Sequence, residues 1–182
     1  MIGARRLARI SRPWRFIAAA VLIALSVAAA PALSQQSSKS AGRAELRITG
    51  AAGHPLVLHD EDLLAMKRQS VAVTGEKGGK AVYEGVPVAD LLERAGAPLK
   101  EKLRGPAIAL YVVAEAADGY RAVFAITEFD SAFTSQTILL ADRRDGHPLT
   151  SADGPFKIIV PAEKRHARWV RQVTALDLQR AR

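Results

Sequence analysis

Two Asp-Gly dipeptides, each next to short apolar runs, constrain the fold of this chain most strongly. Asp118-Gly119 separates the β-prone run 107–115 from a second run at 120–125. Asp-Gly between two such runs is a specific hairpin signal, because both turn positions need residues that tolerate a positive φ. Asp145-Gly146 follows the run 138–141 and predicts a second turn. The chain is therefore expected to consist largely of short antiparallel strands.

The other expected elements are short as well. Strands are expected over 44–49, 56–58, 70–74, 81–83, 156–160 and 169–178, and helical segments over 61–67, 89–95 and 128–132. Asp60 is expected to cap the first helix, and Gly96 to end the second in a left-handed conformation. About eight strands and two or three helices without a repeat indicate an α+β fold with a mixed, barrel-like sheet.

The first 34 residues have the anatomy of a secretory signal. Five arginines and no acidic residue accompany an apolar run at 16–30, and small residues precede Gln35. An uncleaved anchor is the alternative, but a run of about 15 residues is shorter than the roughly 20 that span a bilayer. Residues 35–43 are expected to form a flexible tether and 44–182 the domain, periplasmic or secreted, with no stable membrane span after cleavage.

Charge and cysteine content exclude several classes of function. The whole chain has 26 basic and 18 acidic side chains, and loss of the five leader arginines leaves 21 against 18, a net charge of +3. Such a balance does not indicate a nucleic-acid partner. The chain contains no cysteine, which excludes disulfides, zinc–thiolate sites and thiol nucleophiles. The domain must therefore be held together by packing.

The basic loop 161–169 is the strongest candidate for a binding site. It contains Lys164, Arg165, His166 and Arg168. A guanidinium can donate two hydrogen bonds to one oxyanion, and a histidine can titrate near neutral pH or hydrogen-bond an anion. We therefore expect these four side chains to bind a phosphate, pyrophosphate or carboxylate; the alternative is a solvated charge cluster.

Other residues are weaker candidates for function. Trp169, at the end of the basic loop, is expected to anchor the core. Arg143-Arg144 and His147 flank a turn and could form a second basic edge. The sequence has no glycine-rich phosphate loop, nucleophile elbow or paired His-Glu metal helix, so no catalytic or metal-ligating residue is predicted.

Three ordered segments of the chain match the pattern of a known family. They are YEGVPVADLL at 83–92, the hairpin region 118–149, and the strand and basic loop formed by GPFKIIVP at 154–161 and RHARWV at 165–170. In this order and spacing they resemble the molybdopterin-binding domain of the sulfite oxidase family over residues 44–178. The resemblance implies that family's fold, in a short, exported, stand-alone form.

The resemblance also implies a cofactor and part of its site. In the family, basic residues of the last loop help hold the pterin phosphate, and Arg165 and Arg168 stand at the matching positions. Molybdopterin is therefore the implied cofactor. The family attaches molybdenum through a cysteine thiolate upstream of the Gly-Val-Pro element, where this chain offers only Ser70 and Thr74. Because a hydroxyl is a poor substitute for a soft thiolate, no protein thiolate is expected to hold molybdenum here.

Three functions are compatible with these observations. The first is an exported domain that binds an anionic small molecule, a pterin or a degenerate cofactor, without oxygen-atom-transfer catalysis. The second is an active molybdenum-cofactor oxidoreductase with non-cysteine coordination. The third is a non-catalytic module that interacts with an envelope protein in a redox or signalling system. We favour the first, because the basic loop suits an anion and the thiolate is missing.

Overall fold

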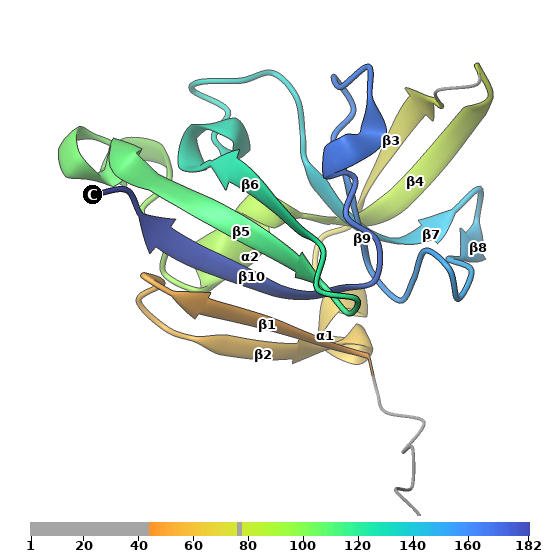
Figure 1. Ribbon diagram of the computed structural model, residues 1–182, viewed down its shortest axis with the longest axis horizontal. Helices are drawn as coiled ribbons and strands as arrows, with labels where there is room; N and C mark the ends of the chain where they lie inside the picture. The colour runs from red at the N-terminus through yellow and green to blue at the C-terminus, as the bar shows by residue number, and fades with distance from the viewer. Residues whose placement is uncertain (1–43, 76–77) are drawn as a thin grey trace, which may run out of the picture. The chain divides into compact units, whose positions relative to one another are not determined.

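The computed structural model describes residues 44–75 and 78–182, which form ten strands, two α-helices and four 3-10 turns (Figure 1). The strands are β1 (Glu45–Gly50), β2 (Leu56–His59), β3 (Gln69–Thr74), β4 (Lys80–Pro87), β5 (Leu110–Ala116), β6 (Arg121–Ala125), β7 (Leu139–Arg144), β8 (His147–Pro148), β9 (Lys157–Ile159) and β10 (Val173–Arg180). The helices are α1 (Asp60–Leu64) and α2 (Val88–Arg94), and the 3-10 turns are η1 (Lys100–Lys102), η2 (Gly105–Ala109), η3 (Ile126–Phe129) and η4 (His166–Arg168). The expected signal, 1–34, and tether, 35–43, lie outside the described residues, so the domain boundaries stay predictions.

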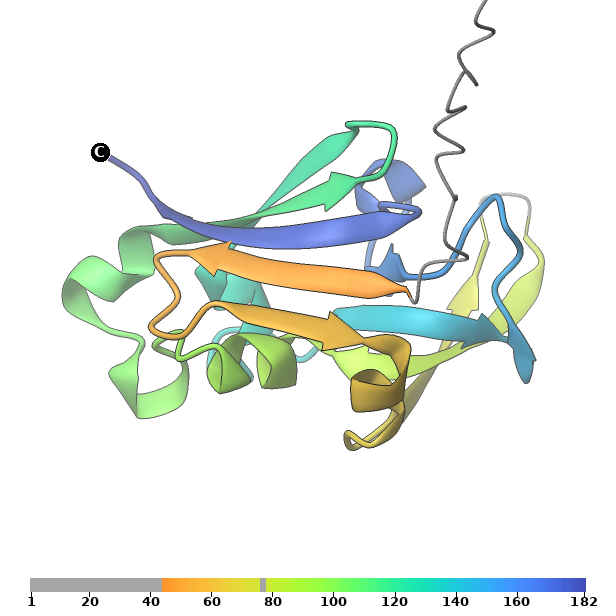
Figure 2. The same ribbon diagram turned by 90° about the horizontal axis from the view of Figure 1, so that it is seen from below.

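The strands form two sheets that enclose the core. The first sheet has the order β2-β1-β10-β5-β6, and the second has the order β3-β4-β7-β8 with β9 also paired to β7. β1 and β10, side by side in Figure 2, are parallel, and the other strand pairs of the described residues are antiparallel. The fold is therefore mostly β with a mixed sheet and few short helices, which confirms the expected class.

Buried and exposed residues alternate along the strands, and the buried ones form the core. In β5 every second residue is buried, and in β1 the buried residues are Leu46 and Ile48. Because successive side chains of a strand point to opposite faces, each strand gives one set of side chains to the interior. Both sheets contribute to a single cluster of buried apolar residues, which includes Phe124 of β6 and Ile158 of β9.

Both Asp-Gly pairs lie in hairpin turns, but only at Asp145-Gly146 do both residues have a positive φ. Gly119 has a φ of 84°, and β5 and β6 pair as an antiparallel hairpin around it. Asp145 and Gly146 both have positive φ, 50° and 78°, and connect β7 to β8. A two-residue hairpin turn of this kind requires positive φ at both positions. The Asp145 carboxylate also accepts a hydrogen bond from the Val82 amide at 2.8 Å, which ties the turn to β4.

Gly85 is required by a close approach between two strands. The register of β4 against β7 shifts between Glu84 and Gly85. A Cβ atom at Gly85 would lie 2.0 Å from the backbone oxygen of Leu140. The glycine of the Gly-Val-Pro segment thus allows β4 to pack tightly against β7 where the pairing is irregular.

Several expected element boundaries were wrong. Asp60 is the first residue of α1 rather than its cap; His59 stands at the cap position, and its amide donates to the Asp62 carboxylate at 2.9 Å. The helix ends at Leu64 instead of residue 67, and the Ala65 amide closes its last turn by donating to the Glu61 oxygen at 3.1 Å. The segment expected as a helix over 128–132 is the earlier 3-10 turn η3.

Two expected strands also begin later than predicted. Residues 107–109 belong to η2, because Pro106 favours the start of a helical turn there, and the strand begins only at Leu110. Residues 169–172 precede β10 and lie outside it, and Gln172 has a φ of 49°, which no strand accommodates. No helix within residues 44–75 and 78–182 is long and apolar enough to span a bilayer.

Candidate functional site

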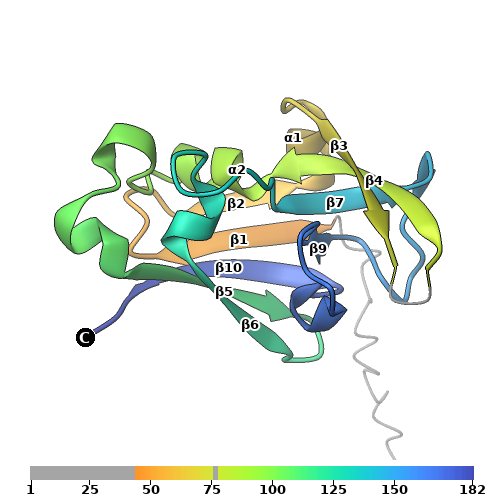
Figure 3. The ribbon, with the colours of Figure 1, turned by 90° about the horizontal axis from the view of Figure 1, so that it is seen from above.

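The basic loop is fixed between β9 and β10 by backbone and indole hydrogen bonds. The Ile158 amide donates to the Val170 oxygen at 2.8 Å, and the Trp169 amide donates to the His166 oxygen at 3.0 Å. The Trp169 indole is 6% exposed, and its Nε1–H donates to the Val160 oxygen at 3.1 Å. The expectation that Trp169 anchors the core is confirmed. Figure 3 shows η4 next to β9 and the β5–β6 turn.

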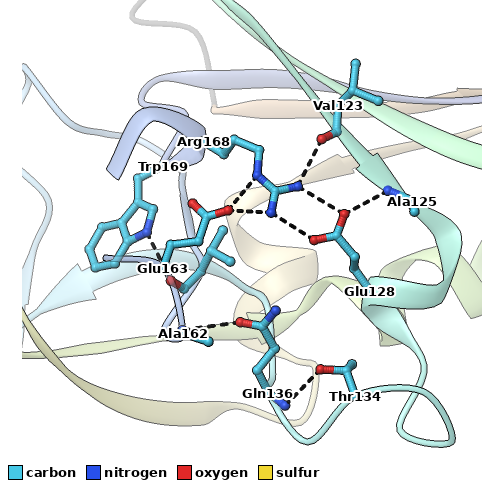
Figure 4. Close-up of polar contacts among 10 residues, drawn as sticks. Val123, Ala125, Glu128, Thr134, Gln136, Ala162, Glu163, Arg168 and Trp169 are labelled. Atoms are coloured by element: carbon cyan, nitrogen blue, oxygen red, sulfur yellow. Dashed lines mark hydrogen bonds and ion pairs between the residues drawn. The ribbon is translucent and has the colours of Figure 1, made fainter. Parts of the chain in front are cut away.

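Arg168 lies in the middle of an internal network rather than in a cavity (Figure 4). Its Nη1 and Nη2 donate to the two carboxylate oxygens of Glu128 at 3.0 and 2.9 Å. Nε and Nη2 contact Glu163 Oε1, and Nη1 also donates to the Val123 oxygen at 3.1 Å. These contacts use all five N–H donors of the guanidinium.

This network stabilises the protonated, charged form of Arg168. Hydrogen bonding to Glu128 raises the pKa of Arg168, burial opposes that shift, and Glu163 raises the pKa further. The guanidinium carbon also lies 4.7 Å from the centroid of the Phe124 ring, within the range of a cation–π contact. Arg168 therefore ties the loop to β6 and η3.

Lys164 and Arg165 point to solvent. Both are exposed, and neither side chain makes a hydrogen bond or ion pair with another of the residues that the structure describes. Of the four side chains predicted to bind an anion, only His166 lines the cavity described next. The structure thus separates the four rather than bringing them together, and anion binding by them stays a prediction.

A cavity of about 310 Å³ opens beside η4 and is lined by both basic and aromatic side chains. We call it the cationic cavity; its functional lining is Tyr83, Arg144, Lys157, His166, Trp169 and Arg171. The imidazole of His166 stacks on the indole of Trp169 with centroids 3.6 Å apart and an interplanar angle of 11°. Tyr83 meets Trp169 edge-on at 5.9 Å.

Strand register places the cations around Tyr83. β4 and β7 pair with Tyr83 opposite Arg144, and β9 pairs with β7 so that Lys157 lies opposite Ala141. As a result the Arg144 guanidinium carbon and the Lys157 ammonium each lie 5.7 Å from the Tyr83 ring centroid. Burial raises the pKa of Tyr83, while the charge of Arg144 lowers it by a smaller amount.

The cationic cavity has an excess of positive charge. Lys157 pairs with Asp153 at 3.1 Å and Arg144 with Asp145 at 3.3 Å. Arg171 is exposed and forms no ion pair within the described part of the chain. Among the residues that the structure describes, the three cations of the lining are thus accompanied by two paired carboxylates.

A second, smaller cavity of about 210 Å³ adjoins the first. His166, Trp169 and Arg171 line both cavities. Tyr120, from the β5–β6 turn, lines the smaller one and donates its hydroxyl to the Ala167 oxygen at 2.7 Å. The η4 segment thus borders both cavities, and the β5–β6 hairpin borders the smaller one.

The donor groups present do not fit a thiolate-bound molybdenum. The chain contains no cysteine. Ser70 and Thr74, the hydroxyls of the expected attachment segment, lie on the exposed face of β3 and do not line the cationic cavity. Among the described residues, no group of three or more His, Asp or Glu side chains could hold a metal ion.

Sequence reasoning missed half of the cavity lining. Arg144 was a weak candidate, and Tyr83, Lys157 and Arg171 were not candidates. Lys157 carries the clearest signal in retrospect, because it is the only charged residue in the apolar segment 156–160. A lysine within a buried strand needs an anion or a cavity nearby.

Comparison with known proteins identifies a family and solved structures with a similar fold. The family model described as the oxidoreductase molybdopterin binding domain matches residues 34–182. The sulfane dehydrogenase SoxCD from Paracoccus pantotrophus is similar in structure, with a TM-score of 0.59, 22% sequence identity, and coverage of 74% of this chain and 38% of that chain. The chain therefore spans well under half of that protein's chain, and the likeness concerns the fold. No curated protein matches the sequence.

Proposed function

Because the chain belongs to the oxidoreductase molybdopterin-binding domain family, we propose that it binds a phosphate-bearing pterin, or a similar anion, in the cationic cavity without catalysing oxygen-atom transfer. The observation behind this proposal is the convergence of Arg144, Lys157 and Arg171 on a cavity walled by the His166–Trp169 stack. Such a cavity joins positive charge to a flat aromatic surface. A ligand with an anionic group and a planar ring matches both features.

The cations suit a phosphate because two are held in place and one is free to pair. Asp145 and Asp153 each hold one cation by a single ion pair, at 3.3 and 3.1 Å, so the cations keep donors for a ligand. Arg171 can offer its planar fork, which matches two phosphate oxygens. The anionic group is therefore assigned to the space between Arg171 and the two tethered cations.

The aromatic side chains suit a planar ring. Because Trp169 and Tyr83 are only 6% and 4% exposed, a ligand ring would pack on the partly exposed imidazole of His166, which stacks on Trp169. The volume of about 310 Å³ lies at the lower end of the range for small-molecule sites, about 300–1,000 Å³. The adjoining cavity beside Tyr120 gives room for a ligand that extends past Arg171.

The proposal excludes oxygen-atom transfer because the chain lacks the side chain that would attach molybdenum. A protein thiolate is the attachment that the family resemblance implies for molybdenum, and this sequence has none. A ligand in the cationic cavity is then held by ion pairs, hydrogen bonds and stacking. Export of the domain, from the features of residues 1–34, is part of the same proposal, and N-terminal sequencing of the protein purified from its host tests it.

Titration calorimetry tests the binding proposal. The probe is neopterin monophosphate, and unphosphorylated neopterin is the ligand control. Arg171→Ala is expected to weaken binding of the phosphorylated probe by about tenfold, the effect of one charge-assisted bidentate contact. Arg121→Ala is the matched control, because Arg121 is an exposed arginine that pairs with Glu115 outside the cavity. Equal affinities for both probes, or for Arg171→Ala and the wild type, would contradict the proposal.

A further inference from the structure

Arg168 stands between two residues of the cationic cavity yet does not face it. His166 and Trp169 line the cavity, while the guanidinium of Arg168 is directed to β6 and η3 (Figure 4). Arg168 is also one of the four side chains that the sequence predicts to bind an anion, and one of the two that the family resemblance implies. The contacts of its guanidinium explain why this arginine does not line the cavity.

The reason is that two carboxylates occupy the edges with which a guanidinium binds oxyanions. Glu128 takes the Nη1–Nη2 edge with both of its oxygens, at 3.0 and 2.9 Å. Glu163 takes the Nε–Nη2 edge through Oε1. These are the two bidentate edges that a phosphate would otherwise use. The Val123 oxygen accepts the remaining N–H.

The arrangement is not explained by stability alone. Two carboxylates surround one guanidinium, so the cluster has a net negative charge. Glu163 Oε2 is buried and has no hydrogen-bond partner among the described residues. A buried carboxylate oxygen without a partner costs free energy, and one carboxylate would suffice to pair the arginine. The carboxylate of Glu163 has an effect that the carboxylate of Glu128 does not have. It occupies the Nε–Nη2 edge, which Glu128 leaves open to another oxyanion.

We propose that Glu128 and Glu163 are specificity-determining residues that act as built-in anions and exclude an external oxyanion from Arg168. The ligand's anionic group is then confined to Arg144, Lys157 and Arg171. This assignment deepens the proposed function and rests on it for the place where the ligand binds. The exclusion of anions from Arg168 itself depends only on the network around the guanidinium.

Removing the two negative charges should turn Arg168 into an anion site. Inorganic pyrophosphate is the probe, and calorimetry compares the wild type with a double variant, Glu128→Gln with Glu163→Gln. We expect at least about tenfold tighter binding in the double variant, since one bidentate contact to an anion is gained. Adding Arg168→Met to the double variant should return the affinity to the wild-type value. An unchanged affinity in the folded double variant, or a gain that survives Arg168→Met, would overturn the proposal.

A matched control separates this local effect from a change in net charge. Glu45→Gln with Glu115→Gln removes the same two charges from exposed ion pairs with Arg47 and Arg121. It should leave pyrophosphate affinity within about twofold of the wild type, because exposed charges are screened. An equal gain in this control would show that the effect is general and would overturn the assignment.

A spectroscopic readout keeps the test independent of the proposed function. The Nε–H signal of Arg168 in nitrogen–proton NMR reports directly on its hydrogen bond to Glu163. Pyrophosphate should not shift this signal in the wild type and should shift it in the double variant, or in Glu163→Gln alone if the double variant fails to fold. A shift in the wild type would overturn the exclusion. If Arg171→Ala does not weaken the binding of pyrophosphate to the wild type, the proposed ligand site is wrong. The comparison of Arg168 in the wild type and the double variant would still test the exclusion.

Discussion

Replacement of Trp169 by alanine tests the packing of the candidate site. The indole is 6% exposed, stacks on His166 at 3.6 Å and meets Tyr83 at 5.9 Å. Removal of a buried aromatic side chain of this size costs about 3–5 kcal/mol, which includes the cavity left behind. The change also leaves the Val160 oxygen without the hydrogen bond it accepts from Nε1 at 3.1 Å, which adds to the cost.

Urea unfolding and a thermal melt measure this cost. A loss of about 3–5 kcal/mol lowers the melting temperature on the order of 10 °C for a domain of this size. Trp169→Phe is the matched control; it keeps a buried aromatic ring but loses the indole N–H and part of the ring volume, so we expect a smaller cost of about 1–2 kcal/mol. If Trp169→Ala leaves the melting temperature within experimental error, the indole does not anchor the core and the wall of the cavity is wrongly placed.

Three further changes test other parts of the structure. Arg168→Met should destabilise the fold by about 2 kcal/mol, because it leaves two carboxylates unpaired in a partly exposed site, and should leave pterin-phosphate affinity unchanged; urea unfolding and calorimetry measure both effects. Gly85→Ala should cost at least about 3 kcal/mol, since its Cβ would lie 2.0 Å from the Leu140 oxygen; a stability within about 1 kcal/mol of the wild type would contradict the tight approach. Burial raises the pKa of Tyr83 above its ordinary value of 10.0, so the folded state favours the neutral phenol and stability should fall as the pH rises above 10.0. Tyr83→Phe should reduce this alkaline loss of stability, and an identical pH profile for the variant would contradict it.

Local conformational demands explain which parts of the fold the sequence predicts. Gly119, Asp145 and Gly146 lie in turns at positive φ, which glycine and aspartate adopt with less strain than most other residues. Gly96 ends α2 with a φ of 83° for the same reason. The ends of strands depend instead on pairing with distant segments. The alternation over 169–178 predicts a strand from residue 169, but the chain turns at Gln172 before β10 begins.

The candidate site was only partly predictable, because its parts come from separate segments. Clustering of basic residues in one loop pointed to His166 and Arg168. The partner that removes Arg168 from the cavity, Glu128, lies 40 positions earlier on η3, and no local pattern relates the two. Arg144 and Lys157 meet Tyr83 through the register of β7 with β4 and β9, which is set by pairing across the sheet.

Native mass spectrometry with metal analysis tests the central claim most directly. The protein is purified without denaturation from a molybdenum-replete host, together with its Arg171→Ala variant. The account predicts a bound phosphorylated pterin or similar organic anion on the wild type, at less than stoichiometric molybdenum, and its loss from the variant. Stoichiometric molybdenum on the wild type, or the same bound anion on both proteins, would contradict the account.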